Sequence, residues 1–163
     1  MSLYEKLFIA LSEVRYVVVG GLAVVLHGHA RLTADVDLII DLTPSEAEKA
    51  VRALESTGLR PRAPVRAAEF ADPEKRRVWI EQKGMRVFSL WDPKNPLREV
   101  DLFVEHPLPF EELFARSELL EVGAVTIRVA SIPDLISLKR ISARPEDLAD
   151  IEALEALLER RTG

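Results

Sequence analysis

The chain has 163 residues, of which 48% are hydrophobic and 30% charged, and its net charge is −5. This size predicts one domain, residues 1–163, with a buried core, and the acidic balance argues against a general nucleic-acid coat. The absence of cysteine excludes disulfides, thiolate metal sites and cysteine nucleophiles. No apolar run is long enough for a transmembrane helix, and Met1–Leu11 lacks the basic start and cleavage site of a signal peptide. We therefore expect a cytoplasmic protein without a membrane partner.

The first part of the chain alternates between short helices and strands. We expect a helix over Leu3–Leu11, a buried strand over Tyr16–Val19, a helix over Leu22–His27 and a strand over Val36–Ile40. A further helix is expected from Pro44 to Ser56, because Thr43 has the N-cap position and Glu46 completes a capping-box pattern.

The second part contains a hairpin followed by more helices. The pattern predicts a polar helix over Pro73–Gln82, strands over Arg86–Trp91 and Glu99–Val104, a short helix over Phe110–Ala115, a last strand over Ala124–Val129, and helices over Ser131–Ser142 and Pro145–Arg161. The order indicates a mixed α/β (α+β) fold, a small sheet flanked by helices. Within it we expect a catalytic core over about residues 14–105 and a C-terminal helical pair over about 131–161.

Three carboxylates stand out on the predicted strands. Asp35 and Asp37 are two residues apart, so their side chains share one face of a strand. Asp101 lies within an otherwise apolar strand, where an unpaired charge is costly. A divalent cation held by all three would remove the repulsion and the cost, and Mg²⁺ prefers such oxygen ligands. An Asp-x-Asp pair is also common as a turn or capping feature at strand ends, so the pair alone is a weak signal.

A glycine pair precedes these carboxylates. Gly20 and Gly21 stand between a buried strand and a helix, where backbone N–H groups can approach a phosphate. The alternative is a tight strand-to-helix turn without a ligand. A phosphate cradle and a metal-binding pair joined by one short helix support each other, because metal-bound triphosphate needs both.

These residues resemble the polymerase-β-like nucleotidyltransferase superfamily. The resemblance rests on the glycine pair, on Arg31-x-Thr33-x-Asp35-x-Asp37, and on a C-terminal pattern: Pro133-Asp134-Leu135-Ile136, Lys139, Ala143-Arg144, Asp147 and Asp150-Ile151. It spans residues 16 to about 154 and is nearest to the abortive-infection (AbiEii-type) branch. Many superfamily members carry Gly-Ser where this chain has a glycine pair, and the Gly-Gly form occurs in that branch.

The resemblance implies transfer of a nucleoside monophosphate from a nucleoside triphosphate (NTP) to an acceptor hydroxyl. It implies that Asp35 and Asp37 coordinate Mg²⁺ or Mn²⁺, that Asp101 completes the site and helps to deprotonate the acceptor, and that Gly20 and Gly21 bind the triphosphate. Two-metal catalysis is the corresponding chemistry.

Basic residues near these motifs have two interpretations each. Lys139 lies on or beside the apolar stripe of its predicted helix, so it either extends to solvent or binds phosphate in a cleft. Arg144 either reaches the same phosphates or pairs locally with Asp147 or Asp150. Arg31 and Thr33 either position the substrate or only stabilise a turn.

The partner of the reaction is left open by the sequence. Residues 60–86 carry eight basic and four acidic side chains, which favours either a solvated helix face or a surface for a polyanion such as tRNA. A protein or small molecule is an alternative acceptor, and a toxin–antitoxin component with an antitoxin partner is one interpretation of the whole chain. A non-catalytic nucleotide- or partner-binding module is the other. The apolar stripe of the last helix packs on its own core or forms a homodimer.

Overall fold

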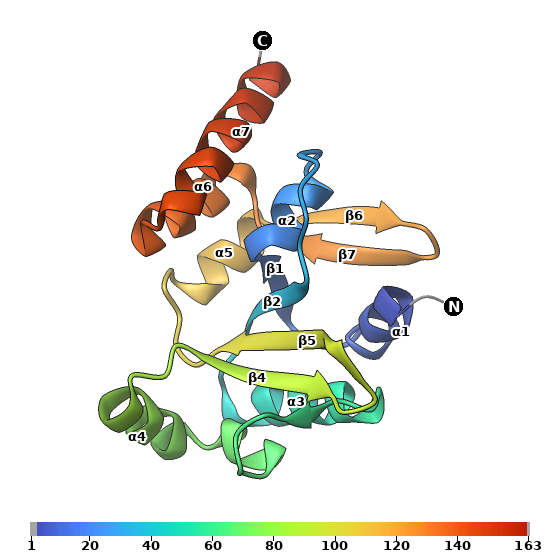
Figure 1. Ribbon diagram of the computed structural model, residues 1–163, viewed down its shortest axis with the longest axis vertical. Coiled ribbons are helices and arrows are strands. Elements are labelled where there is room, and N and C mark those ends of the chain that lie inside the picture. The colour runs from blue at the N-terminus through green and yellow to red at the C-terminus, as the bar shows by residue number, and fades with distance from the viewer. Residues whose placement is uncertain (1–2, 163) are drawn as a thin grey trace.

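The structure, a computed structural model, describes residues 3–162, and these form a seven-stranded mixed sheet flanked by helices (Figure 1). Residues 1, 2 and 163 of the expected domain lie outside the described part. The strands are β1 (Tyr16–Val19), β2 (Asp35–Ile40), β3 (Arg60–Pro61), β4 (Val87–Asp92), β5 (Asn95–Phe103), β6 (Glu118–Val122) and β7 (Val125–Val129). The helices are α1 (Leu3–Ala10), α2 (Gly20–Leu26), α3 (Pro44–Ser56), the 3-10 helix η1 (Ala67–Ala71), α4 (Pro73–Lys83), α5 (Phe110–Arg116), α6 (Ile132–Ser142) and α7 (Pro145–Thr162).

The centre of the sheet is made by β1 and β2. The strand order is β3-β4-β5-β2-β1-β7-β6, with β1 antiparallel to β2 and β2 parallel to β5. All four residues of β1 are buried, as its run of valines predicts for a strand covered on both faces. On its other side β2 pairs with β5, and this pairing determines where the predicted carboxylates meet.

The expected α3 is present with Thr43 at the N-cap position and Pro44 at the first helical position, but the predicted capping box does not form. The helix begins at Pro44 and buries Ala47, Ala50, Val51 and Leu54, the spacing of one helical face. The Thr43 side chain makes no cap hydrogen bond. Its hydroxyl instead donates to Asp41 Oδ1 at 2.9 Å, because Asp41 is itself held in place by Arg15.

Two strands were missed, the two-residue β3 and the longer β6. Glu118–Val122 forms β6, an edge strand that pairs antiparallel with β7. Its sequence gives no clean alternation, because an edge strand beside solvent tolerates adjacent leucines and two glutamates. The sheet therefore continues beyond the expected catalytic core of residues 14–105, and β7 packs its end beside Val18 of β1.

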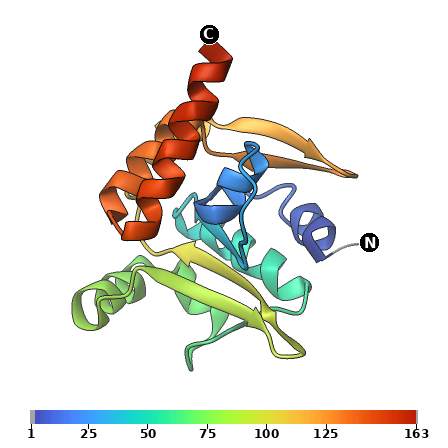
Figure 2. The same ribbon diagram turned by 45° about the horizontal axis from the view of Figure 1, so that its top comes forward.

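The C-terminal helical pair is present, as α6 and α7. Ser131 caps α6 by accepting a hydrogen bond from the Asp134 backbone N–H, as expected. Figure 2 shows that the α6–α7 pair and the β4–β5 hairpin lie at opposite ends of the molecule, with β2 and α2 between them. Within residues 3–162, no helix has both the length and the apolar character that a membrane span requires.

Candidate active site

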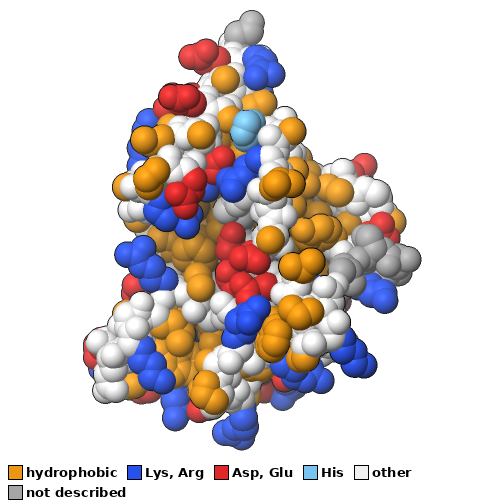
Figure 3. Space-filling model, viewed as in Figure 1, with side chains coloured by type: hydrophobic (Ala, Val, Ile, Leu, Met, Phe, Trp, Pro, Cys, Tyr) orange, Lys and Arg blue, Asp and Glu red, His pale blue; other side chains and the backbone are white. Residues whose placement is uncertain are grey.

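The parallel pairing of β2 with β5 brings four carboxylates onto one patch. Asp35 lies opposite Glu99, and Asp37 lies opposite Asp101. Because alternate residues of a strand share a face, all four side chains project from the same side of the sheet. Figure 3 shows acidic side chains gathered in the middle of this face, with basic side chains above and below them.

Three of these carboxylates form a compact group. One oxygen each from Asp35, Glu99 and Asp101 lies within 4.8 Å of the others. Glu99 was not predicted as a site residue, although its place two residues before Asp101 on the same strand was a usable signal. Asp37 has a different neighbour: a Cβ atom added to Gly20 would lie 2.2 Å from Asp37 Oδ2. The Asp37 carboxylate therefore faces the glycine turn.

Burial and mutual repulsion make these carboxylates hard to ionise together. Burial, followed by the charge of Asp35, raises the pKa of Asp37 to about 6. Burial raises the pKa of Asp101 to about 7, against the opposing effect of a hydrogen bond from Ser89. Burial and the charge of Glu99 also raise the pKa of Asp35. The patch therefore carries an excess of negative charge that a cation would relieve.

Two residues of the hairpin side hold the carboxylates in position. The Ser89 hydroxyl on β4 donates to Asp101 Oδ1 at 2.6 Å. The Arg62 guanidinium pairs with Glu99 and also stacks over Trp91, with 4.4 Å between its Cζ and the ring centroid. Both residues were missed, because only the folded sheet brings residues 62 and 89 next to residues 99 and 101.

The glycine turn is covered by the segment that leads into β2. Gly20 has φ +69°, which favours glycine, and α2 begins there. A Cβ atom added to Gly21 would lie 2.7 Å from Thr33 Oγ1 and 3.5 Å from Arg31 Cζ. The structure thus brings Arg31 and Thr33 against the glycine pair, beside Asp37.

A buried charge network from α6 and α7 completes this side of the site. Lys139 Nζ lies 2.9 Å from Asp150 Oδ2 and 3.3 Å from Asp147 Oδ1. Asp150 also pairs with Arg31, and Asp147 accepts from Arg144 Nε at 3.3 Å. Three cations thus meet two buried carboxylates, and Arg144 also pairs with the exposed Glu146 at 3.6 Å.

This network settles the local contacts of two basic residues. Lys139 is only 7% exposed, so the interpretation that it extends to solvent is wrong. Arg144 makes the predicted local pair with Asp147. Both cations also lower the pKa of Asp37, against the effect of its burial, so their positive charge reaches the carboxylate patch.

Most of the basic side chains of residues 60–86 pair with carboxylates or backbone carbonyls of the protein itself. Arg77 pairs with Glu74 and Glu81, and Lys75 with Glu69. Arg76 is buried and donates to the backbone carbonyls of Phe70 and Leu42, so it faces inward. The interpretation of this segment as a polyanion surface is correspondingly weakened.

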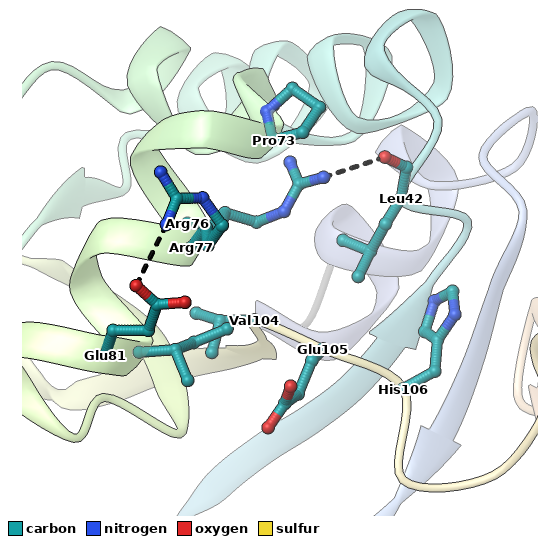
Figure 4. A pocket seen from close by; sticks show the side chains of 9 residues that line it. Leu42, Pro73, Arg76, Arg77, Glu81, Val104, Glu105 and His106 are labelled. Atoms are coloured by element: carbon teal, nitrogen blue, oxygen red, sulfur yellow. Dashed lines mark hydrogen bonds and ion pairs between the residues drawn. The ribbon is translucent and has the colours of Figure 1, made fainter.

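A cavity of about 350 Å³ lies away from the carboxylates (Figure 4). It is bounded by α4 and by residues that follow β2 and β5, including Leu42, Val104 and His106. The Arg76 guanidinium points across it toward the Leu42 carbonyl, and Arg77 turns toward Glu81. None of the predicted site residues, all of them in the described part of the chain, lines it, and the carboxylates lie toward the other ends of these strands.

Comparisons with known proteins identify the fold and the family of the chain. The solved structure of the lincosamide antibiotic adenylyltransferase LnuA, with lincomycin bound, is similar with a TM-score of 0.59; the match has 16% identity and covers 94% of this chain and 96% of that one. This likeness shows a nucleotidyltransferase fold. No curated protein sequence gives a significant match. Residues 2–160 match the family model described as "Nucleotidyltransferase of unknown function (DUF6036)". The chain therefore belongs to this family of nucleotidyltransferases.

Proposed function

We propose that the chain transfers a nucleoside monophosphate from an NTP to an acceptor hydroxyl, with Mg²⁺ or Mn²⁺ bound by Asp35, Asp37 and Asp101. The observation that carries this proposal is the juxtaposition of a carboxylate patch on β2 and β5 with the basic residues Arg31, Lys139 and Arg144. A metal-bound triphosphate has the matching pair of charges: cations for the carboxylates and phosphates for the basic residues.

The donor set fits a hard divalent cation. Asp35, Asp37, Glu99 and Asp101 offer carboxylate oxygens, the ligands that Mg²⁺ and Mn²⁺ prefer. The raised pKa values of Asp35, Asp37 and Asp101 mean that ionising these three together is unfavourable without added positive charge. We include Glu99 as a further ligand because its oxygen lies within 4.8 Å of those of Asp35 and Asp101.

In this proposal the phosphates bind at the glycine turn and the basic residues beside the carboxylates. Gly20 and Gly21 present backbone without side chains beside Asp37, and Arg31 and Thr33 lie against the same turn. Lys139 and Arg144 supply further positive charge close to Asp37. Together these residues would hold the triphosphate with its α-phosphate next to the carboxylates.

The chemical step then requires one proton acceptor. The acceptor oxygen attacks the α-phosphorus, the bond from that phosphorus to the oxygen bridging to the β-phosphate breaks, and pyrophosphate leaves. Asp101 takes the hydroxyl proton, and Ser89 orients its carboxylate by donating to Oδ1. A bound divalent ion supplies positive charge that stabilises the entering and leaving oxygens.

The proposal is tested by following two labels. ATP labelled at the α-phosphate, and separately at the γ-phosphate, is incubated with the protein and Mg²⁺ or Mn²⁺ in the presence of total tRNA, protein or hydroxylated small molecules. We expect α-label on one acceptor pool, no γ-label, and one pyrophosphate for each transfer. Transfer of the γ-label would instead mean a kinase, and would overturn the proposal.

A matched pair of variants separates chemistry from folding. Asp37→Asn removes one carboxylate of the patch and should abolish transfer. Asp134→Asn alters another buried carboxylate, whose Oδ2 lies 2.9 Å from Nε of Arg116 on α5. This variant should transfer at a rate near that of the wild type. Undiminished transfer by the Asp37 variant would contradict the assignment of the site.

The toxin–antitoxin role, an antitoxin partner and the AbiEii-type branch stay proposals that rest on the sequence resemblance. The homodimer proposal has some support from α7, where Leu148 of the apolar stripe is 64% exposed while Leu154 is fully buried. The alternative of a non-catalytic binding module predicts nucleotide binding without transfer of either label.

A further inference from the structure

A second cavity, of about 310 Å³, lies where α6 ends and α7 begins. Apolar groups of Ala143, Pro145, Leu148 and Ile151 line it, together with the basic residues Lys139, Arg140 and Arg144. Ala143, which makes the turn between the helices, has φ +49°. The volume is in the range of small-molecule sites, which begins at about 300 Å³.

This cavity shares Lys139 and Arg144 with the proposed phosphate site. Lys139 lines the cavity and carries its amino group into the buried network with Asp147 and Asp150. Arg144 also lines the cavity, and its charge acts on Asp37. A ligand whose phosphates lie at these two cations would therefore have its remaining part beside the cavity.

The lining has the chemistry of a stacking site. Leu148 is 64% exposed, which places a large apolar surface in contact with water at the rim. Figure 3 shows hydrophobic and basic side chains side by side over α6 and α7. A planar nucleobase is apolar on its faces and stacks favourably on guanidinium groups, which Arg140 and Arg144 supply.

We propose that this cavity binds the nucleobase of the donor triphosphate, an inference that rests on the proposed function. Among the described residues that line it, none has a neutral amide or hydroxyl side chain. Its one acidic residue, Asp147, is fully buried and already engaged by Ser142, Lys139 and Arg144. Apart from the three basic side chains, the described lining residues offer the base no free side-chain hydrogen-bonding partner, so the base is recognised mainly by apolar contact and stacking.

Weak discrimination between the four bases follows. A site that rejects an analogue strongly needs polar groups that the wrong ligand leaves unpaired, whereas stacking tolerates every base. We expect the dissociation constants of ATP, GTP, CTP and UTP, measured by calorimetry with Mg²⁺, to lie within about tenfold of one another.

The test compares ligands with and without a base. Inorganic tripolyphosphate occupies the phosphate site and has nothing to place in the cavity. Leu148→Ala should weaken the binding of all four NTPs by about fivefold to tenfold, the effect of a partly lost stacking contact, and leave tripolyphosphate binding unchanged. Leu119→Ala is the matched control, since Leu119 on β6 is 59% exposed and does not line the cavity.

Two results would overturn the inference: equal NTP binding by the Leu148 variant and the wild type, or a preference above about a hundredfold for one base in the wild type, which needs a hydrogen-bonding site. The readout is binding, so the outcome is separate from that of the transfer assay. A protein that binds NTPs through Leu148 but transfers no label contradicts the proposed function and supports the base site.

Discussion

Replacing Gly20 by alanine tests how the glycine turn and Asp37 depend on each other. The backbone has φ +69° there, and a left-handed conformation costs a non-glycine residue about 1–2 kcal/mol. The new Cβ would also lie 2.2 Å from Asp37 Oδ2, so the carboxylate must move. Pushing a side chain off its rotamer costs about 0.5–1.5 kcal/mol, so we expect a total loss of about 2–3 kcal/mol in the free energy of unfolding.

Gly84→Ala provides the control for the backbone contribution alone. Gly84 caps α4 with φ +59°, and no described atom lies within 4 Å of an added Cβ. It should lose only the backbone part, about 1–2 kcal/mol, in urea denaturation. Metal-dependent NTP binding should be lost in the Gly20 variant and retained in the Gly84 variant. If both variants bind NTP equally well, the site does not depend on the close approach of Gly20 to Asp37.

Three further variants probe the groups around the site. Lys139→Met leaves Asp147 and Asp150 short of a buried partner, so thermal and urea denaturation should show a loss of about 3–5 kcal/mol; wild-type stability would contradict the buried network. Asp147→Asn should destabilise the protein at pH 7. Burial opposes ionisation of Asp147, but hydrogen bonds from Ser142 and Arg144 outweigh it and lower the pKa of this carboxyl below 3.8, its value in the unfolded chain. The ionised carboxylate therefore stabilises the fold fully above pH 3.8, and this stabilisation is lost as the pH falls from 3.8 through the lower pKa of the folded state. The difference from wild type should therefore shrink below about pH 4, and a constant difference would exclude this ionic contribution. Ser89→Ala should weaken Mn²⁺ binding, followed by calorimetry, by about tenfold, because Ser89 fixes Asp101; unchanged affinity would show that the hydrogen bond does not orient a ligand.

Much of the fold follows from local patterns. The valines of β1 and the spacing of Ala47, Ala50 and Leu54 in α3 each bury a complete strand or face, so periodicity identifies them. The β6 edge strand lacks such a pattern, because solvent covers part of it and both Leu119 and Val122 are exposed. The capping-box rule also failed at Thr43, whose hydroxyl donates to Asp41 two residues earlier and not to the first turn of α3.

The residues of the candidate site were predictable where a single short segment of the sequence identifies them. Asp35 and Asp37 share a face by strand geometry alone, and Asp101 is conspicuous in an apolar strand. The partners of these residues depend on tertiary structure: the β2–β5 register brings Glu99 beside Asp35, and the α6–α7 packing buries Lys139 between two aspartates. A sequence pattern for Lys139 gives only its helical face, which is why the sequence left both solvent and cleft open as its surroundings.

Metal-dependent binding of nucleotide is the most direct test of the central claim. Titration calorimetry with ATP, GTP, CTP and UTP, with and without Mg²⁺, compares the wild-type protein with the Asp35→Ala/Asp37→Ala double variant. We expect the wild-type protein to bind NTPs only when Mg²⁺ is present, and the double variant to bind none. Circular dichroism checks that the double variant is folded. Binding of NTPs by that folded variant with wild-type affinity, or no binding of any NTP by the wild type, would contradict the central claim.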